Sequence, residues 1–523
     1  MKLSSALILT IALIGSAHAQ CPDFTTFSQT PQGDPSSGPL ALPFMRVTPE
    51  CRTFNSTAVE KVITDMKARL KDPDIARLFE NTYPNTLDTT VKYFSKEENL
   101  AFIITGDITA QWLRDTGNQF AAYTSVLALD PSLATLVKAV INNEARYVSA
   151  FPYCGSFQPP PESGLAPSHN SFADLVTVDP PVNNRTVFEC KYELDSLCGF
   201  LKLSRNYYNQ TKDTSIFNDQ WYTAIDQIFR VVNEQSQSNF DADFNWVSFY
   251  NWTGEPWIVE PTRQQCWRGG AEGVYGNPND ERNIVGMVGT HHRPSDDLST
   301  FAFLTPANAM LSVELGHLAD ILTASGQSKT AQGKNVSEQA TLWSKRTRDA
   351  IWNTTAGYIS VVNNIFAYET NGLGSRYVMD DANVPSLLSL PYLGFLDIND
   401  PAYVATRKLL LSRANPYFAA GANFSGIGGP HVDAWNPWPM SQITAIFGTD
   451  NDDEIMTSLY LIANNTAGLG LIHESQSIYN YTSYTRSWFA WANSYFAEML
   501  LDLAKRKPGL IFKTNEPYVP GQR

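Results

Sequence analysis

The sequence predicts an all-α fold, a helical toroid of the (α/α)6 barrel type with minor β-hairpins. Apolar residues recur at helical spacing in about eleven segments, whereas strand-type alternation is confined to short pieces. No linker or composition break divides the chain, and no repeat of fixed period indicates an α-solenoid, which is the alternative. We therefore expect one large helical domain.

The predicted helices follow one another along nearly the whole chain. Several begin after a Pro, Asp or Ser, residues that suit a helix N-terminus. The proline-rich stretch 158–167 is interpreted as a surface insertion, because a helical pattern resumes on both sides of it. Strands are expected within 244–252 and 357–370. The predicted helical segments are 56–83, 109–129, 131–151, 194–211, 221–236, 306–325, 337–353, 384–393, 401–412, 452–467 and 486–506.

Composition excludes several classes of protein. Hydrophobic residues make up 43% of the chain and charged residues 17%, values typical of a globular protein with a large core. The formal net charge is −14, and the chain has no run of lysine or arginine. Nucleic acid and anionic membrane surfaces are therefore not expected partners, and an acidic substrate is disfavoured.

The amino terminus resembles a cleaved secretory signal. Residues 1–19 contain an early lysine, a short apolar run and a small-x-small cleavage site. The apolar run is too short to span about 30 Å of hydrocarbon, which argues against a membrane anchor. We expect a signal peptide over 1–19, an N-terminal extension over 20–43 and a catalytic domain over 44–523. Secretion to the extracellular space follows from this division.

Sequons and cysteines agree with an oxidising, extracellular compartment. If Cys190 and Cys198 share one continuous helix, they cannot bond to each other, and Cys198 is then a buried free thiol. Pairing of the cysteines is otherwise open. The Asn-x-Ser/Thr sequons, typical of a glycoprotein, begin at Asn55, Asn184, Asn209, Asn251, Asn335, Asn353, Asn423, Asn464 and Asn480; the cysteines are Cys21, Cys51, Cys154, Cys190, Cys198 and Cys266.

Metal and nucleophile motifs are weak or missing. The chain has no GxSxG, P-loop or suitably placed GxGxxG pattern. "HESQS", which contains His473 and Glu474, lacks the second histidine of a zinc protease motif. "THHRPSDD" offers histidines and aspartates, but not at the helical spacing that directs two ligands at one ion. We expect neither a metal nor another cofactor.

Carboxylates embedded in aromatic segments are the distinctive feature of the chain. An unpaired buried carboxylate is costly, so each needs a partner or a function. Glycoside hydrolysis uses pairs of such groups, and aromatic rings supply flat faces for sugars. The simpler interpretation is a set of core ion pairs, such as Arg114 with Asp115 or Glu474 with Arg486. The carboxylates concerned are Asp115, Glu193, Asp195, Asp296, Asp297 and Glu474.

A series of blocks along the chain resembles one known family. The blocks are "TGDITAQWLRDT", "YELDSLC", "HRPSDDLSTFAFLTPANAM", "MDDANVPSLLSLPYL", "GIGGPHVDAWNPWPMSQI" and "GLIHESQSIYNYTSYTRSWFAWANSYFAEML". In this order they are similar to the exo-α-1,6-mannosidases of glycoside hydrolase family 125, which are inverting enzymes with an (α/α)6 barrel. The resemblance covers about residues 44–507.

The resemblance implies roles for individual residues. Asp195 is the expected general acid, and Glu474 is the expected general base that activates water. The terminal mannose is expected to bind Arg114, Asp115, His292, Arg293, Asp296, Asp297 and Asn308. The histidine before Arg293, where relatives often have an aromatic residue, and the varied middle of the Glu474 block put details of the pocket in question.

Elementary chemistry sets conditions on these two roles. Asp195 must hold a proton near the working pH, although the dipole of a helix beginning beside it lowers its pKa, so burial or Glu193 must outweigh the dipole. Glu474 must be ionised. An inverting mechanism also requires the two carboxyl groups to lie about 6.5–9.5 Å apart.

The sequence thus predicts a secreted, monomeric, inverting exo-mannosidase that removes terminal mannose from α-1,6-linked mannosides or glycans. The alternatives are another (α/α)6 glycosidase, a polysaccharide lyase, and a secreted carbohydrate-binding protein without turnover. A lyase usually requires a Tyr or His base and a basic subsite for its acidic substrate, which the net charge disfavours.

Overall fold

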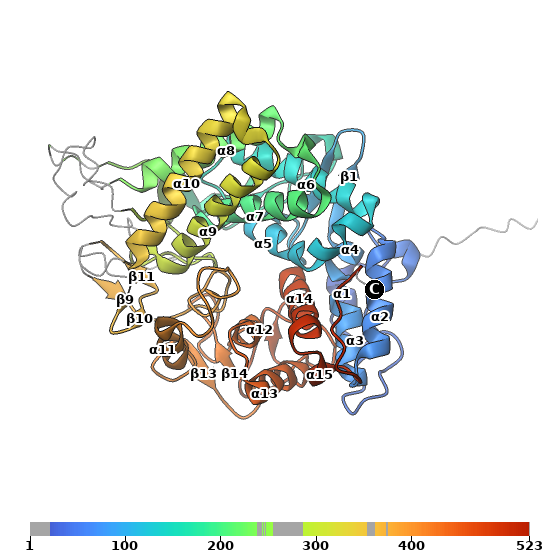
Figure 1. Ribbon diagram of the computed structural model, residues 1–523. Coiled ribbons are helices and arrows are strands. Elements are labelled where there is room, and N and C mark those ends of the chain that lie inside the picture. Colours follow the sequence, from blue (N-terminus) through green and yellow to red (C-terminus); the bar gives the residue numbers. More distant parts are fainter. Residues whose placement is uncertain are drawn as a thin grey trace, which may run out of the picture.

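The fold is that of a ring of helices, shown along the ring axis in Figure 1. The structure is a computed structural model that describes residues 21–237, 243, 245, 247–254, 286–352, 361–372 and 375–521. Helices dominate, and the strands form only small two- and three-stranded sheets. The predicted all-α (α/α)6 toroid is confirmed. The expected signal peptide (residues 1–19), Cys266 and the sequon at Asn353 lie outside the described residues.

The inner helices surround the centre of the ring. Contacts join α5 to α7, α7 to α9, α12 to α14 and α14 back to α5. The last inner helix therefore packs against the first, and residues far apart in sequence meet at the centre. The inner helices are α5 (Leu113–Gln119), α7 (Leu194–Thr211), α9 (Thr305–Ala324), α12 (Pro439–Phe447) and α14 (Ala490–Arg506).

Residues 384–393, between α10 and α11, form turns, so the helix predicted there is wrong. Asp380 accepts hydrogen bonds from Leu387 N at 2.8 Å and Leu388 N at 2.9 Å, which holds this backbone in a turn. Pro391 has no N–H for a helical hydrogen bond. Tyr392 then fills the space by packing its ring against two aromatic side chains of neighbouring inner helices, at 4.9 Å and 5.2 Å.

The outer helices cover the inner ones, and α8, α10 and α13 lie outside them in Figure 1. Contacts pair α6 with α7, α10 with α9, α13 with α12 and α3 with α14. The single helix predicted over 56–83 is two helices, because Asp72 caps a second helix by accepting from Asp74 N and Ile75 N. The outer helices are α2 (Thr57–Arg69), α3 (Pro73–Thr82), α6 (Pro131–Ala150), α8 (Asp219–Gln235), α10 (Ala331–Trp352), α11 (Pro401–Leu410) and α13 (Asp452–Ala463).

Short elements complete the described chain. The pieces expected as strands within 244–252 and 357–370 overlap β7, β9, β10 and β11. The helices are α1 (Phe24–Phe27), α4 (Asn85–Thr89) and α15 (Pro508–Ile511), and the strands are β1 (Val91–Ser95), β2 (Leu100–Ile103), β3 (Gln111–Trp112), β4 (Ser156–Phe157), β5 (Val176–Asp179), β6 (Val187–Glu189), β7 (Asn251–Gly254), β8 (Phe303–Leu304), β9 (Val361–Val362), β10 (Ile365–Phe366), β11 (Glu369–Thr370), β12 (Arg376–Tyr377), β13 (Phe418–Ala420), β14 (Ser425–Ile427), β15 (Ser475–Gln476) and β16 (Tyr484–Thr485). No helix in this part of the chain combines the length and apolar character that a membrane span requires.

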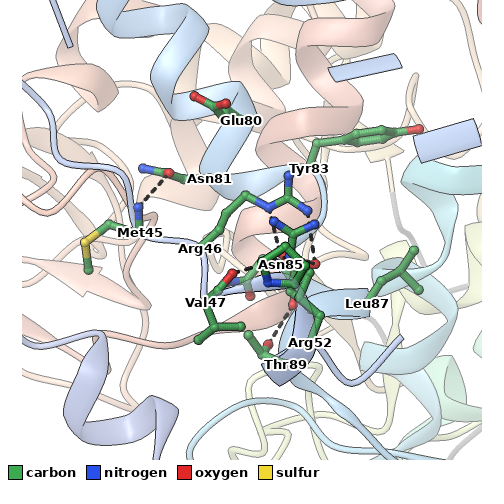
Figure 2. A network of polar contacts seen from close by, with 12 residues as sticks. Met45, Arg46, Val47, Arg52, Glu80, Asn81, Tyr83, Asn85, Leu87 and Thr89 are labelled. Carbon is green, nitrogen blue, oxygen red and sulfur yellow. Dashed lines mark hydrogen bonds and ion pairs between the residues drawn. The ribbon is translucent and has the colours of Figure 1, made fainter. Parts of the chain in front are cut away.

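A polar network fixes the segment that leads into the ring. Arg46 Nε pairs with Asp88 Oδ2 at 2.7 Å, and the guanidinium of Arg46 also binds Glu60. Met45 N donates to Asn81 Oδ1 at 3.0 Å, drawn as a dashed line in Figure 2. Arg46 and Asp88 are both buried, so removal of either residue would leave the other as a buried charge without a counter-ion.

The first described residues are fastened to the segment that precedes α14. The Phe24 ring packs against Trp488 at 5.1 Å between centroids, and Ser28 and Ser487 share a hydrogen bond of 2.6 Å between hydroxyls. The Cys21–Cys51 disulfide closes this region covalently. The segment 487–489 is therefore held from outside the ring.

Two disulfides confirm the expectation of oxidised cysteines. They join Cys21 to Cys51 and Cys154 to Cys190, while Cys198 is a buried free thiol as predicted. That prediction assumed that Cys190 and Cys198 share one helix. In the structure α7 begins at Leu194, so Cys190 lies before the helix.

A buried carboxyl group sits between α6 and the strand that leads into α5. Glu144 is fully buried and accepts one hydrogen bond of 3.2 Å from Gln111 Nε2. Burial raises the pKa of Glu144 to about 8, although the hydrogen bond from Gln111 acts against this. The carboxyl group is therefore protonated in the folded protein over a pH range in which an unfolded chain ionises it.

Folding stability is expected to fall as pH rises from 5 to 8, because Glu144 binds a proton in the native state that the unfolded state has lost. The contribution of this group changes by about 3–4 kcal/mol between these pH values. Thermal or urea unfolding of wild type and Glu144→Gln measures it. The variant should lose less stability between these pH values than wild type, and an identical pH dependence contradicts the assignment.

Candidate active site

A pocket lies where the N-terminal ends of the inner helices meet. Its lining residues lie within segments 105–115, 294–296 and 486–491, together with Asn383, His431, Trp438 and Glu474. The space between the lining atoms is about 450 Å³, part of it open to solvent. Closure of the ring brings these distant segments together.

The inner and outer helices differ in how they begin. The first turn of each of the outer helices α2, α3, α6, α8, α11 and α13 donates a backbone N–H hydrogen bond to the side chain of its N-cap residue, whereas the inner helices α5, α7, α9, α12 and α14 form no such bond. The inner helices α5, α12 and α14, which begin at the pocket, thus present the positive ends of their dipoles without this cap. This arrangement favours anionic groups near the centre of the ring.

Arg114 holds a cluster of carboxylates at one side of the pocket. Its guanidinium contacts Asp115 Oδ2 at 3.0 Å, Glu193 Oε2 at 2.9 Å and Asp296 Oδ1 at 3.3 Å, and it lies 5.6 Å from the centroid of the Trp491 ring. Burial alone disfavours the charged form of Arg114, but the attraction of these carboxylates raises its pKa well above normal. One permanent cation therefore compensates several buried acids.

Asp115 and Asp296 respond in opposite ways to this cluster. Burial raises the pKa of Asp115 to about 6, against the attraction of Arg114. Burial also acts on Asp296, but Lys191 and Arg114 outweigh it and lower the pKa of that carboxyl far below its usual range. Asp296 is therefore ionised at neutral pH. Its backbone lies in the left-handed region, with φ of 68°. Both side chains line the pocket.

Asp195 belongs to the same cluster but is not part of the pocket wall. It lies in the first turn of α7, and no other residue of the described structure donates a hydrogen bond to its carboxyl oxygens. Burial, against the attraction of Arg114, raises the pKa of Asp195 to about 7. Burial raises the pKa of Glu193 well above normal as well. The dipole of α7 is therefore outweighed, and Asp195 can hold a proton near neutral pH.

Glu474 lies on another wall of the pocket, in a different environment. It immediately precedes the β15–β16 hairpin, whose two strands pair Ser475 with Thr485. Its carboxylate accepts hydrogen bonds from Arg486 Nε at 3.0 Å and from Thr485 Oγ1 at 2.8 Å. Arg486 also pairs with Asp107 at 2.6 Å, so the cation is shared. These two donors fix the position of the Glu474 carboxylate at the pocket wall.

His473 supports this hairpin rather than a metal ion. Its ring stacks on Tyr484 with 3.9 Å between centroids, and its Nε2 lies 3.1 Å from the Thr466 carbonyl. Burial lowers the pKa of His473 to about 4, so the ring is neutral and donates to that carbonyl. Within the described residues, no group of three or more His, Cys, Asp or Glu side chains is arranged to hold a metal ion.

The structure places four of the expected sugar-binding residues away from the pocket wall. Arg293 Nε pairs with buried Glu369 at 2.6 Å. His292 is buried, and burial together with the adjacent His291 lowers its pKa well below normal. Asn308 donates to the Val288 and Leu304 carbonyls and accepts from Val288 N, so its amide braces the backbone.

Asp297, the fourth of these residues, approaches a side chain that sequence reasoning missed. His431 Nδ1 lies 3.8 Å from Asp297 Oδ1, and His431 lines the pocket. Burial lowers the pKa of His431, but Asp297 outweighs this and leaves the pKa raised. His431 is contained in the block "GIGGPHVDAWNPWPMSQI", so a signal for it was present in the sequence.

Aromatic faces make up much of the remaining wall. Trp112, Trp438, Phe489 and Trp491 line the pocket, and each is at or next to the first residue of an inner helix. Rings at these positions offer apolar surfaces to the carbon faces of a sugar, while the carboxylates can accept hydrogen bonds from its hydroxyls. The pocket thus combines stacking surfaces with carboxylates.

Comparison with known proteins identifies similar chains. Residues 72–501 match the family described as metal-independent alpha-mannosidase (GH125). The meiotically up-regulated gene 157 protein of Schizosaccharomyces pombe is 44% identical over 498 residues, which cover 94% of each chain. A solved Streptococcus pneumoniae metal-independent α-mannosidase, in a non-productive complex with α-1,6-mannobiose, is 29% identical with a TM-score of 0.72. That match covers 86% of this chain and 99% of the bacterial one.

Removal of the central cation is expected to destabilise the fold in a pH-dependent way. Arg114→Met leaves buried carboxylates without a counter-ion, and we expect a loss of about 3–5 kcal/mol at pH 7.5. The loss should be smaller at pH 5, because the carboxyl groups then bind protons. Urea unfolding at both pH values measures this, with Arg114→Lys as a charge-preserving control. An equal loss at both pH values would indicate that Arg114 acts by packing on Trp491 instead.

Proposed function

The chain belongs to the metal-independent α-mannosidases of glycoside hydrolase family 125, and we propose that it is a secreted, inverting exo-α-1,6-mannosidase. The family and the mannosidase neighbour support the coarser statement, a glycoside hydrolase acting on mannosides. The α-1,6 linkage is proposed because the sequence blocks resemble exo-α-1,6-mannosidases and the bacterial relative was solved with α-1,6-mannobiose. The two disulfides accord with secretion, which amino-terminal sequencing of protein from culture medium tests.

The contrast between two carboxyl groups carries the mechanistic proposal. Asp195 is buried without a hydrogen-bond donor and has a pKa of about 7, so it can give a proton to the leaving glycosidic oxygen. Glu474 lines the pocket, accepts hydrogen bonds from Arg486 and Thr485, and is assigned the role of general base. Environments that separate two acids in this way are typical of paired acid and base catalysts.

The proposed reaction proceeds in one displacement. Glu474 takes a proton from water, and the resulting oxygen attacks the anomeric carbon from the face opposite the leaving group. The bond between that carbon and the glycosidic oxygen breaks as Asp195 protonates the oxygen. The products are β-mannose and a chain shorter by one sugar, after which proton exchange with solvent resets both carboxyl groups.

Other pocket residues are assigned supporting roles. Arg114, Asp115 and Asp296 are proposed to bind the hydroxyls of the terminal mannose, and His431 joins them as a residue of the wall. Like Asp195, the side chains of His292, Arg293, Asp297 and Asn308 are not part of the pocket wall. We propose that these four act by holding neighbouring groups, as the Arg293–Glu369 pair, the Asn308 hydrogen bonds and the contact of Asp297 with His431 indicate.

Proton NMR of the protein acting on α-1,6-mannobiose tests the reaction directly. We expect β-mannose to appear first, and Asp195→Asn and Glu474→Gln each to lower kcat at least about a hundredfold. Asp433→Asn, at an exposed acid on the loop beside the pocket, is the matched control and should keep wild-type rates. First appearance of α-mannose contradicts inversion. Tight binding without release supports instead the carbohydrate-binding protein that lacks turnover.

The pH dependence tests the assignment of the acid. Because Asp195 must be protonated to act and its pKa is about 7, kcat/KM should fall about tenfold per pH unit above this value. Initial rates on α-1,6-mannobiose from pH 5 to 9 give the profile. A rate that stays constant up to pH 9 would exclude Asp195 as the general acid.

A further inference from the structure

The hairpin that follows Glu474 carries exposed aromatic side chains beside the mouth of the pocket. Among the residues that the structure describes, five tryptophan or tyrosine side chains are strongly exposed. Three of these, Trp435 at 50%, Tyr479 at 70% and Tyr481 at 52%, belong to two adjoining loops. We call these three residues the aromatic lip. Single exposed apolar residues are ordinary, whereas a group of aromatic rings at one site indicates a binding surface.

Backbone contacts connect the aromatic lip to the pocket. Gln476 N donates to the Pro437 carbonyl at 2.9 Å, and Ile478 N donates to the Trp435 carbonyl at 3.0 Å. The chain leaving Glu474 therefore runs antiparallel to the chain that reaches Trp438, and both of these residues line the pocket. Trp435 lies at most about 10 Å along the chain from Trp438. The two loops that carry the lip are thus directly continuous with the pocket wall at Glu474 and Trp438.

The tip of the hairpin is held rigidly although its aromatic rings are exposed. Buried Gln476 donates through Nε2 to the carbonyls of Asn480 at 3.2 Å and Tyr481 at 3.0 Å. From the opposite side, Asn423 N donates to the Ile478 carbonyl at 3.0 Å, and its side chain bonds to the Tyr479 carbonyl. A fixed backbone lowers the entropy lost when a ligand binds to the side chains it carries.

We propose that the aromatic lip binds the part of an α-linked mannose chain that remains after cleavage, beyond the sugar next to the scissile bond. This inference rests on the proposed function, because it assigns the leaving end of the same substrate. Stacking on flat rings suits a neutral oligosaccharide, since it requires no charge from the ligand. The lip therefore gives the enzyme a preference for longer chains over disaccharides.

Kinetics on substrates of two lengths test the proposal. Wild-type protein, treated with an endoglycosidase so that glycans at the neighbouring sequons cannot cover the lip, is compared with Trp435→Ala and Tyr479→Ala. Each variant should lose about tenfold in kcat/KM on α-1,6-mannotetraose, mainly through KM, and stay within about twofold of wild type on α-1,6-mannobiose. Tyr460→Ala, at an exposed tyrosine on the outer helix α13, is the matched control and should change neither value.

Two results overturn the proposal. An equal loss on both substrates means that the lip only supports the Glu474 hairpin, and an unchanged rate on mannotetraose means that the lip does not bind the substrate. Light scattering provides a further check. If wild type is a dimer and Trp435→Ala is a monomer, the lip serves self-association and not substrate binding.

A binding measurement separates this proposal from the proposed function. Calorimetric titration of mannotetraose into Glu474→Gln and into the double variant with Trp435→Ala requires no turnover. Weaker binding by the double variant supports the proposal for the lip even if wild type cleaves no α-1,6-mannoside. Absence of cleavage by wild type would contradict the proposed function alone. Equal binding by the two variants counts against the lip.

Discussion

The contact of one guanidinium with several buried carboxyl groups is the interaction on which the centre of this protein depends. Arg114 pairs with Asp115, Glu193 and Asp296, and these contacts join three segments of the chain. Without that cation the acids would have to be neutral or leave the interior. The uncapped N-termini of the inner helices add partial positive charge from several directions. The toroid thus brings several buried carboxyl groups together at its centre.

Burial and the surrounding charges give these acids different protonation behaviour. Asp296 is close to two cations and stays ionised, whereas Asp195 is buried without a donor and keeps its proton up to neutral pH. Glu474 is separated from this cluster and has its own partner in Arg486. Similar chemical groups therefore differ because of their surroundings, and those surroundings are set by the segment that carries each group.

Local patterns in the sequence predict much of the fold but not its exceptions. The helices over 131–151 and 194–211 match α6 and α7 within one residue, because amphipathic periodicity and the flanking residues agree. The helix α12 (Pro439–Phe447) was missed because it is nearly buried on all sides and shows no polar stripe. The segment 384–393 has helical spacing, yet the contacts of Asp380 override it.

The candidate site was predictable in its chemistry more than in its geometry. Resemblance to a family selected Arg114, Asp115, Asp296 and Glu474, which line one pocket. The resemblance does not distinguish a residue that lines the pocket from one that lies behind the wall, because this difference depends on how the ring closes. Asn308, whose amide is engaged by backbone groups, shows the difference, and His431 reached the wall from a loop with no periodic pattern.

Closure of the ring also sets the order in which the protein can mature. The segment that carries Glu474 and the helix α14 come late in the chain, yet α14 must pack between α12 and α5 to complete the circle. A nascent chain emerging from the ribosome therefore carries its acid cluster long before the opposite wall exists. The pocket is the last region to assemble, and synthesis of almost the entire polypeptide precedes any competence to bind a sugar.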